Sequence, residues 1–418
     1  MKDEFHRIKR LPPYIFEEVN RLKAKARAAG ADIIDFGMGN PDMPTPPHII
    51  EKLVETARNP RTNRYSASRG IPGLRRAMAG YYRRRFGVQL DPEREVIATL
   101  GSKEGFANLA MAITGPGDVV VVPNPSYPIH AFGFILAGAV IRHMPIQFGP
   151  QGPGDEFFRT LERAVRHSVP APIAVVLNFP SNPTAQVVGL DFYEEAVRFC
   201  TKHELFILSD LAYADIYFEG EPPPSILQVP GAKEIAIEFQ SLSKTYAMPG
   251  WRVGYAAGNE RLIGALGRIK SYLDYGAFTP IQVAASAALN GPQSCVDEIR
   301  GIYKARRDTL VETMTRAGWP IPSPPASMFA WAPVPEAFKE LGSLGFAKLL
   351  LEEAEIAVSP GIGFGEYGEG YVRIGLVENE QRIRQAARNV RKFLAARGVP
   401  PAPDAVFDPA TPPKRAAS

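Results

Sequence analysis

Short apolar runs alternate with longer amphipathic segments between about residues 95 and 260. The runs cover residues 119–122, 174–177, 206–208, 235–239 and 253–256, and each is followed by a loop rich in Gly, Pro, Ser or Asn. This alternation is typical of crossover units and predicts an α/β fold with a mainly parallel central sheet flanked by helices. Because ligands of such sheets bind beyond the carboxyl ends of the strands, we expect these loops to carry the chemistry.

The two ends of the chain are predicted to form a second, smaller α/β domain. A long amphipathic helix is expected near the end of the chain, with Gly398 as its stop. Beyond it the chain is rich in proline and has almost no apolar periodicity, so we expect disorder. The expected divisions are an N-terminal arm with part of the small domain (1–47), a large domain (48–284), the rest of the small domain (285–397) and a disordered tail (398–418).

Composition places the chain among ordinary globular proteins. Its 418 residues are 45% hydrophobic and 22% charged, which excludes a fully disordered, collagenous or coiled-coil chain. The net charge of +4 does not favour nucleic-acid binding without a basic stripe, and residues 83–85, three arginines, are interpreted as a solvated helix end. The longest apolar stretch, residues 131–141, falls short of the roughly 20 residues that a membrane span needs.

The cysteines and histidines bear on compartment and metals. Cys200 and Cys295 do not make a disulfide framework, and no signal peptide precedes the first predicted elements, so we expect a cytoplasmic protein. The six histidines never pair with cysteine or acid at metal-ligand spacing. We therefore expect no metal site and place the histidines in solvated or core positions.

Two familiar motifs lack their usual context. Gly363, Gly365 and Gly368 form a GxGxxG pattern, but the residues from Tyr371 onward have the pattern of a strand, whereas a dinucleotide site needs a helix there. The segment 241–244 matches the SxxK pattern of serine acyl-enzymes without its companion motifs. Neither motif is taken to predict function.

Several predicted strand ends carry side chains suited to a phosphate-bearing aromatic ring that can form an imine. Lys244 lies between serines, where desolvation would lower its usual pKa of about 10.4 and make it a nucleophile or base, although taken alone it could be an ordinary loop lysine. Arg252 beside hydroxyl groups suits a phosphate dianion. The segment from Gly101 opens a helix whose free N–H groups suit an anion, while a simple helix cap at Ser102 explains it equally. Asp210 ends a very apolar strand, and a protonated pyridine nitrogen would partner its carboxylate.

The sequence resembles the class I and II aminotransferases of the aspartate aminotransferase superfamily over nearly its whole length. That resemblance rests on Asn182-Pro-Thr, Asp210-x-x-Tyr213, Ser241-x-Ser-Lys244 with Arg252, and Arg373. Further segments resemble the bacterial glutamate:pyruvate (alanine) aminotransferases of that family: Leu-Pro-Pro-Tyr14, Gly39-Asn-Pro-Asp42, Tyr65-Ser-Ala-Ser-Arg69, Tyr127-Pro-Ile-His130 and Ser359-Pro-Gly-Ile-Gly-Phe364. Ala185 departs from the pattern, because most relatives have glycine there. The resemblance implies the fold type I of enzymes that depend on pyridoxal 5'-phosphate.

The resemblance also implies roles around that cofactor. Lys244 would form the internal aldimine and later carry the proton between substrate and cofactor as general acid and base. Asp210 would pair with the ring nitrogen and keep it cationic. Tyr213 and Asn182 would hydrogen-bond the phenolic oxygen, and Tyr127 would stack on the ring, with core filler as its alternative.

The phosphate and the substrate complete the implied site. Arg373 would clamp the substrate α-carboxylate, helped by Asn182 and the Gly39 backbone, with a surface arginine as the alternative. Arg69 is a candidate to bind the second carboxylate of glutamate, and a salt bridge at a subunit interface explains it equally. The implied phosphate ligands are Gly101, Ser102, Lys103, Ser241, Ser243, Arg252 and, from a second subunit, Tyr65. The last of these implies a homodimer with shared active sites.

The expected reaction is a ping-pong transamination of L-alanine and 2-oxoglutarate to pyruvate and L-glutamate. The alternatives on the same fold are another amino donor, namely aspartate, LL-diaminopimelate or methionine, or a β-lyase. A regulator of transcription with this fold would need a DNA-binding module, for which roughly ten residues before the first motif leave no room. The resemblance further implies that the bonds Asn124–Pro125 and Asn182–Pro183 are cis, a state found in only about 5% of X–Pro bonds.

Overall fold

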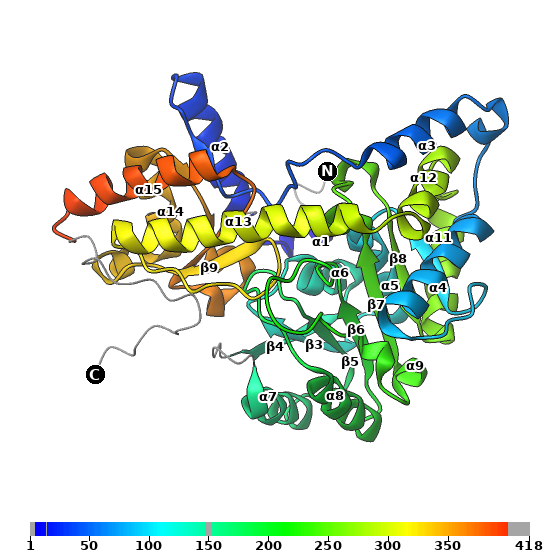
Figure 1. Cartoon of the computed structure of the whole chain (residues 1–418). Helices are drawn as coiled ribbons and strands as arrows, with labels where there is room; N and C mark the ends of the chain where they lie inside the picture. The colour runs from blue at the N-terminus through cyan, green and yellow to red at the C-terminus, as the bar shows by residue number, and fades with distance from the viewer. Residues whose placement is uncertain (1–4, 14, 147–152, 400–418) are drawn as a thin grey trace.

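The structure, a computed structural model, describes residues 5–13, 15–146 and 153–399 of the chain (Figure 1). Tyr14 and the expected disordered tail beyond residue 399 lie outside the described residues. Within the described ranges, none of the helices combines the length and apolarity needed to cross a bilayer.

A seven-stranded sheet forms the centre of the large domain, in the order β2-β8-β7-β6-β5-β3-β4 (Figure 1). The strands from β7 to β4 are parallel, whereas β8 is antiparallel to both β2 and β7. The predicted mainly parallel sheet is therefore confirmed. Its strands are β2 (Val96–Thr99), β3 (Val119–Asn124), β4 (Val140–Pro145), β5 (Pro172–Asn178), β6 (Phe206–Asp210), β7 (Ala236–Ser241) and β8 (Gly254–Gly258).

Helices cover both faces of this sheet. Successive residues of β3 point to opposite sides, so Val120 and Val122 join one core while Val121 joins the other. The first core includes α5 (Ser102–Ile113), α6 (Ile129–Ala137) and α11 (Glu260–Leu273). The second includes α3 (Pro47–Ala57), α4 (Pro72–Phe86), α7 (Gly154–Arg166), α8 (Leu190–Lys202), α9 (Ala232–Ile235) and α12 (Thr279–Asn290). Burial on both faces explains why most strands are continuous apolar runs.

The strand β4 was not predicted. It lies at the edge of the sheet, and Val140, Arg142 and His143 are exposed there. Only some positions of an edge strand are buried, so its sequence does not have to be a continuous apolar run.

The small domain packs helices against two short sheets. Strands β9 (Phe329–Pro333), β11 (Ser359–Pro360) and β12 (Tyr371–Gly375) form an antiparallel sheet in the order β11-β12-β9. Strand β1 (Ile34–Asp35) pairs in parallel with β10 (Ile356–Ala357), so the early part of the chain joins the late part. The helices are α2 (Ile15–Ala28), α13 (Ser294–Ala317), α14 (Gly342–Ala354) and α15 (Glu380–Ala395).

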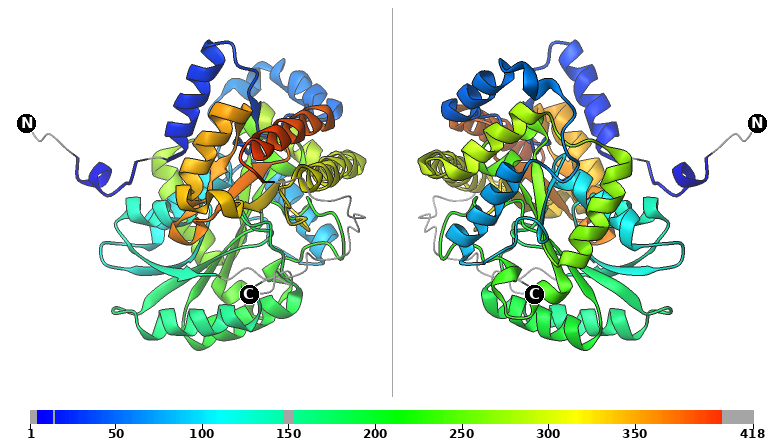
Figure 2. Two further views of the ribbon diagram at one scale, coloured as in Figure 1. Left: turned by 90° about the vertical axis from the view of Figure 1, so that its left-hand side faces the viewer. Right: turned by 90° about the vertical axis from the view of Figure 1, so that its right-hand side faces the viewer.

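The N-terminal arm leaves the body of the protein. Helix α1 (His6–Lys9) projects away from both domains in the two views of Figure 2. Phe5, just before this helix, is 74% exposed, and Ile8, within it, is 61% exposed. These apolar side chains therefore have little contact within the chain.

Three local predictions concern turns and helix ends. The GxGxxG segment forms two turns of 3₁₀ helix and leads into strand β12, not into a helix. Helix α15 ends at Ala395, shortly before Gly398, whose φ is +74°. The bonds Asn124–Pro125 and Asn182–Pro183 are both cis, as predicted, and so are Val169–Pro170 and Phe179–Pro180, which were not predicted.

Candidate active site

A cavity of about 510 Å³ lies where the carboxyl ends of the parallel strands meet the small domain. Such a volume suits a cofactor and a small substrate. Both domains line it, and α2 contributes Phe16, Val19, Asn20 and Lys23. Of the residues predicted for the site, the lining contains Gly39, Ser102, Lys103, Tyr127, Asn182, Asp210, Tyr213, Ser241, Ser243, Lys244, Arg252 and Arg373.

Lys244 lies in the short helix α10 (Leu242–Thr245), directly after β7. The Oγ of Ser241 caps this helix by accepting a hydrogen bond from the N–H of Ser243 at 3.2 Å. The Lys244 Nζ donates to the carbonyl oxygen of Gly39 at 2.9 Å, so it points toward the small domain. Burial, followed by the charges of Arg373 and Arg252, lowers the pKa of Lys244 to about 8. An amine with this pKa can act as a nucleophile or base near neutral pH.

Arg373 comes from β12 and is held on several sides. Its guanidinium carbon lies 4.0 Å from the ring centroid of Phe329 and 4.7 Å from that of Phe364. One terminal nitrogen donates to Asn182 Oδ1 at 2.8 Å, and the other lies 3.4 Å from Ser359 Oγ. A planar cation fixed in this way is suited to bind a carboxylate through two parallel hydrogen bonds.

Asp210 ends β6 and is 7% exposed. One carboxylate oxygen accepts from the N–H of Ala212 at 3.1 Å, and the other lies 2.9 Å from Nε2 of His130. His130, from α6, is fully buried. The sequence predicted solvated or core positions for the histidines, and the burial of His130 agrees with a core position. The structure adds its contact with the Asp210 carboxylate, which the sequence did not predict. A lone histidine in an apolar helix carries no sign of the partner that folding brings to it.

Two tyrosines face the same cavity. Tyr213 is 6% exposed, and its burial raises its pKa well above the ordinary value, so its phenol remains neutral and can donate a hydrogen bond. Tyr127 is partly exposed and meets the His130 ring edge to face, with centroids 5.9 Å apart. The Lys103 Nζ lies 5.9 Å from the Tyr127 ring centroid.

Ser102, Ser241, Ser243 and Arg252 line the cavity and offer donors to an anion. Helix α5 begins at Ser102, after the N-cap Gly101, whose φ is +85°. The first N–H groups of a helix have no intrahelical partners, so those of α5 can bind an anion. A side chain at Gly101 would overlap the guanidinium of Arg252. Arg252 itself is anchored by the carbonyl oxygen of Pro249 at 2.9 Å. Hydroxyls, helix N–H groups and a guanidinium form a donor set that fits a phosphate.

The charges around the cavity favour an anionic ligand. The lining includes the cations Lys23, Lys103, Lys244, Arg252 and Arg373 but only two carboxylates, Asp35 and Asp210. A phosphate and one or two carboxylates would balance this excess. The residues present therefore fit pyridoxal 5'-phosphate with an amino acid substrate.

Tyr65 and Arg69 do not line the cavity of their own chain. Tyr65 is 87% exposed, and its ring lies 4.8 Å from the ring of Tyr275. The Arg69 guanidinium donates to the carbonyl oxygen of Glu93 at 2.9 Å. Sequence reasoning assigned Tyr65 to the site of a second subunit, which a single chain does not test.

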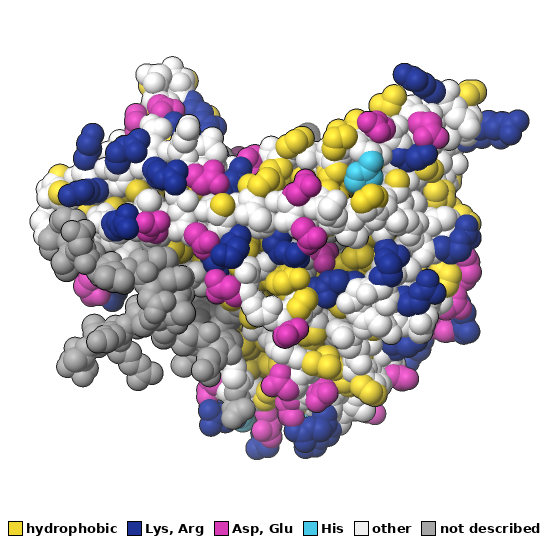
Figure 3. All heavy atoms as spheres, viewed as in Figure 1, with side chains coloured by type: hydrophobic (Ala, Val, Ile, Leu, Met, Phe, Trp, Pro, Cys, Tyr) yellow, Lys and Arg dark blue, Asp and Glu magenta, His cyan; other side chains and the backbone are white. Residues whose placement is uncertain are grey.

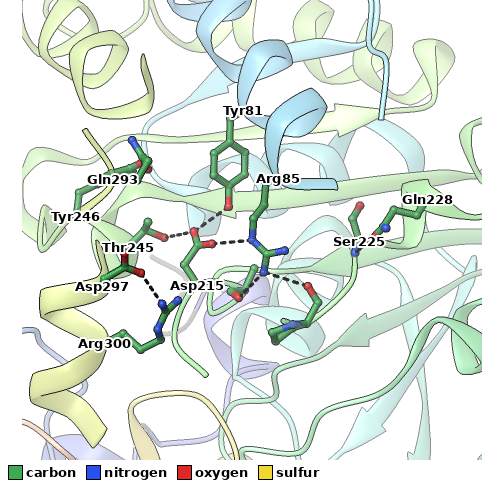
Figure 4. A network of polar contacts seen from close by, with 12 residues as sticks. Tyr81, Arg85, Asp215, Ser225, Gln228, Thr245, Tyr246, Gln293, Asp297 and Arg300 are labelled. Carbon is green, nitrogen blue, oxygen red and sulfur yellow. Dashed lines mark hydrogen bonds and ion pairs between the residues drawn. The ribbon is translucent and has the colours of Figure 1, made fainter. Parts of the chain in front are cut away.

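A polar network links α10, which carries Lys244, to helix α4 of the same domain (Figure 4). The Asp215 carboxylate accepts from Tyr81 at 2.7 Å, from Thr245 at 3.0 Å and from Arg85 at 3.2 Å. Thr245 directly follows Lys244, while Tyr81 and Arg85 belong to α4. Arg85 is thus not part of a solvated helix end, as its sequence neighbours suggested, but the partner of a buried carboxylate.

Fold and site together define an enzyme of the fold type I class that depends on pyridoxal phosphate. The sequence model of the family "Aminotransferase class I and II" matches residues 31–390. The chain belongs to this family. It is therefore an aminotransferase whose cofactor is pyridoxal 5'-phosphate and whose substrates are amino acids and 2-oxo acids.

Individual relatives agree with this assignment. The chain is 54% identical to the glutamate-pyruvate aminotransferase AlaC of Escherichia coli (strain K12), over 95% of both chains. It is 43% identical to an LL-diaminopimelate aminotransferase of Moorella thermoacetica, over 94% of this chain and 98% of the relative. A solved double mutant of Thermus thermophilus aspartate aminotransferase superposes with a TM-score of 0.85 at 29% identity, over 94% of this chain and 100% of the other.

Proposed function

We propose that the protein exchanges the amino group of L-alanine with 2-oxoglutarate, producing pyruvate and L-glutamate. The observation that carries this choice is the 54% identity to a glutamate-pyruvate aminotransferase over 95% of both chains. Identity to the LL-diaminopimelate aminotransferase is lower, at 43%. Both substrates of each half-reaction share an α-carboxylate, for which Arg373 supplies a fixed partner.

The cofactor supplies an aldehyde that binds the substrate amine and a ring that accepts electrons from the substrate Cα. Lys244 would take the proton from that carbon and then donate it to the cofactor, because its lowered pKa of about 8 leaves part of the amine neutral near neutral pH. The Gly39 carbonyl orients this amine in the free protein. Lys244 is thus the catalytic base and acid of the proposal.

Other residues of the chain hold the reacting groups in place. Asp210 would pair with the ring nitrogen and favour its protonated form, while Tyr213 would donate to the phenolic oxygen. Arg373 and Asn182 would bind and orient the α-carboxylate. The N–H groups at the start of α5 would hold the phosphate, with Arg252 as its cation.

An amino-donor panel tests the reaction. The pyridoxal-phosphate-loaded protein is mixed with alanine, aspartate, methionine or LL-diaminopimelate, and the cofactor absorbance is followed with and without 2-oxoglutarate. We expect alanine to react fastest and to yield pyruvate. Faster formation of oxaloacetate from aspartate, or faster reaction of LL-diaminopimelate, would overturn the choice of donor and favour the second group of relatives.

We also propose a homodimer in which each site uses Tyr65 of the other chain. Exposed apolar side chains lie at the end of α11 and on its connection to α12, where Tyr275 contacts Tyr65, and the arm exposes Phe5 and Ile8. These side chains are Tyr272 at 82% exposure, Leu273 at 56%, Tyr275 at 64% and Phe278 at 46%. Such a cluster on one side of a monomer is typical of an interface.

Mixed dimers test the sharing of sites. Lys244→Ala and Tyr65→Ala variants, each nearly inactive, are unfolded, mixed and refolded together. If Tyr65 completes the partner's site, each mixed dimer has one intact site, and about a quarter of the wild-type activity returns under random pairing. If both residues serve the same chain, mixing restores nothing.

The role of Arg69 is tested by its alanine variant. We propose that in the dimer it binds the distal carboxylate of glutamate, with the salt bridge at the interface as the competing explanation. Arg69→Ala should raise the KM for glutamate more than the KM for alanine, because alanine has no second carboxylate. An equal rise for both amino acids would favour the interface.

We propose a cytoplasmic location. The two cysteines are free thiols, with Cys200 buried and Cys295 partly buried. Free thiols are usual in a reducing compartment. Fractionation of cells that express the protein from its own gene tests this location. Recovery of the protein outside the cytoplasmic fraction would contradict the proposal.

A further inference from the structure

A second, much smaller cavity lies behind the Asp210–His130 pair, and the argument built on it rests on the proposed role of Asp210. Its volume is about 10 Å³, which holds roughly one water molecule. His130 and Gln186 both line it, together with Ser126, Asn178 and Ser181. No carboxylate is among its lining residues.

Three buried polar atoms around this cavity have no hydrogen-bond partner among the described residues. They are Nδ1 of His130 and both side-chain atoms of the Gln186 amide, Oε1 and Nε2. His130 is fully buried and Gln186 is 8% exposed. Leaving such groups unpaired in the protein interior is destabilising. Polar atoms in this position are commonly paired through a buried water.

The backbone holds Gln186 at this position. The carbonyl oxygen of Gln186 accepts from the N–H of Ser181 at 2.9 Å, which closes the turn between them. Ala185, just before it, has a φ of +58°, and Asn182 within the same turn binds Arg373. The backbone of Gln186 is therefore fixed beside the site, and its side chain is buried there.

Two titratable groups face the His130 ring and determine which hydrogen bonds it can make. Asp210 lies at Nε2, and Tyr127 meets the ring edge. A neutral imidazole carries one proton, and the hydrogen bond at one nitrogen decides which nitrogen keeps it. For Nε2 to donate to Asp210, Nδ1 must be an acceptor, so a donor is required on the cavity side.

We propose that one buried water, held by the Gln186 amide, donates to Nδ1 of His130 and so fixes the tautomer whose Nε2–H donates to Asp210. Gln186 is thus a positioning residue that acts through the water and His130. A neutral His130 leaves Asp210 with its full negative charge for the cofactor ring nitrogen. The charge available to the ring nitrogen can therefore be adjusted through Gln186 and His130, without altering the Asp210 side chain.

A charged variant tests the proposal on the loaded enzyme. Gln186→Glu places a carboxylate beside Nδ1 and favours the imidazolium, which then shares the charge of Asp210. The ring nitrogen would hold its proton less firmly, so the ring would withdraw fewer electrons from the imine nitrogen that links Lys244 to the bound cofactor. The pKa of that imine nitrogen, read from the cofactor's absorbance, should therefore rise by at least about 0.5. An unchanged pKa in a folded variant would overturn the proposal.

A neutral variant and NMR provide a second measurement that does not depend on activity. In protein labelled with ¹⁵N-histidine, the His130 ring should show the proton on Nε2, with the signal assigned through a His130→Gln variant. Gln186→Met should increase the share of the Nδ1–H tautomer. Wild-type protein with the proton on Nδ1, or no response to Gln186→Met, would contradict the water bridge.

Two controls separate this proposal from the proposed function. Gln240→Met removes another buried amide with an unpartnered nitrogen, one that lines neither cavity, and should change neither measurement. Asp210→Asn should shift the pKa of the imine nitrogen strongly. If it does and Gln186→Glu does not, only the water bridge fails; if Asp210→Asn has no effect, the assigned role of Asp210 fails as well.

Discussion

Lys244 lies close to two fixed cations, and their charges make the folding stability of the cofactor-free protein depend on the protonation of its amine. Burial together with Arg373 and Arg252 lowers the pKa of Lys244 from 10.5 to about 8. The unfolded chain therefore binds this proton more readily than the folded one. The contribution of Lys244 to folding stability is full above pH 10.5 and is lost as the pH falls through about 8.

A Lys244→Met variant should consequently be more stable than the cofactor-free wild type at pH 7. The gain should be about 3 kcal/mol at most, because a tenfold change in a protonation equilibrium is worth about 1.4 kcal/mol. It should disappear toward pH 10.5. Urea unfolding at pH 7 and 10, at one protein concentration, measures it, with Lys304→Met in an exposed part of α13 as control. A variant less stable than wild type at both pH values would contradict the argument.

Arg373 has a geometric as well as an electrostatic role. Arg373→Lys keeps the charge but loses the planar group between Phe329 and Phe364. We expect kcat/KM for alanine to fall about 100-fold, roughly 2.7 kcal/mol, while cofactor affinity changes little. Steady-state kinetics and a cofactor titration measure the two effects. Equal weakening of cofactor binding would show that Arg373 organises the whole cavity.

Twelve of the predicted site residues line one cavity. Those near the central sheet, such as Asp210 and Lys244, lie at or just after strand ends that the apolar runs reveal, whereas Gly39 and Arg373 were expected from the family resemblance. His130 could not be found in this way. Its relation to Asp210 arises from the order in which β3, β5 and β6 lie side by side, since α6 follows β3 while Asp210 ends β6. Sequence periodicity predicts the strands but not their order.

At the scale of elements, α10, which carries Lys244, is held in place by helix α4. Asp215 joins α10 to α4 through Thr245 on one side and Tyr81 and Arg85 on the other (Figure 4). Asp215 is 7% exposed, so its removal leaves the partly buried guanidinium of Arg85 with carbonyl partners but without a carboxylate to balance its charge. The turn that carries Lys244 would also lose its anchor on α4.

We expect Asp215→Ala to lower the free energy of unfolding by about 3 kcal/mol, as for other broken buried ion pairs. Thr245→Val removes a single hydrogen bond and should cost about 1 kcal/mol. Urea unfolding of both variants and of the double variant measures the coupling between them. Strictly additive losses would show that Asp215 does not act through Thr245.

The orientation of β8 is also an element-scale property. Its apolar pattern matches that of the parallel strands, yet β8 runs antiparallel to β7. The connection between them holds only short helical turns and no crossover helix, which a parallel neighbour would need. Apolar pattern predicts that a strand exists, while its direction depends on the connection.

At the scale of the whole molecule, the types of exposed side chain distinguish the proposed interface from the rest of the surface. On the face in Figure 3, Lys and Arg side chains are interspersed with Asp and Glu, as on a typical soluble surface. The exposed aromatic side chains near Tyr65 depart from this pattern. The proposed dimer should therefore depend on them.

Leu273→Glu combined with Phe278→Glu should convert the dimer to a monomer. Two charges in an apolar interface are costly to desolvate, and both side chains are about half exposed in the single chain, so the fold itself should tolerate them. Light scattering after size exclusion measures the mass, and circular dichroism checks the fold. A dimer that persists would place the interface elsewhere.

The pairing of β1 with β10 has a consequence for synthesis on the ribosome. Ile34 lies beside Ile356, so the small domain cannot close until more than three hundred residues have followed its first strand. The large domain lies between them and can fold as a unit while the chain still grows. A nascent chain can therefore bring Lys244, Arg252 and the start of α5 together before Arg373 has been made. Under the proposed roles, most of the residues that hold the cofactor are then in place before the one that binds the substrate carboxylate.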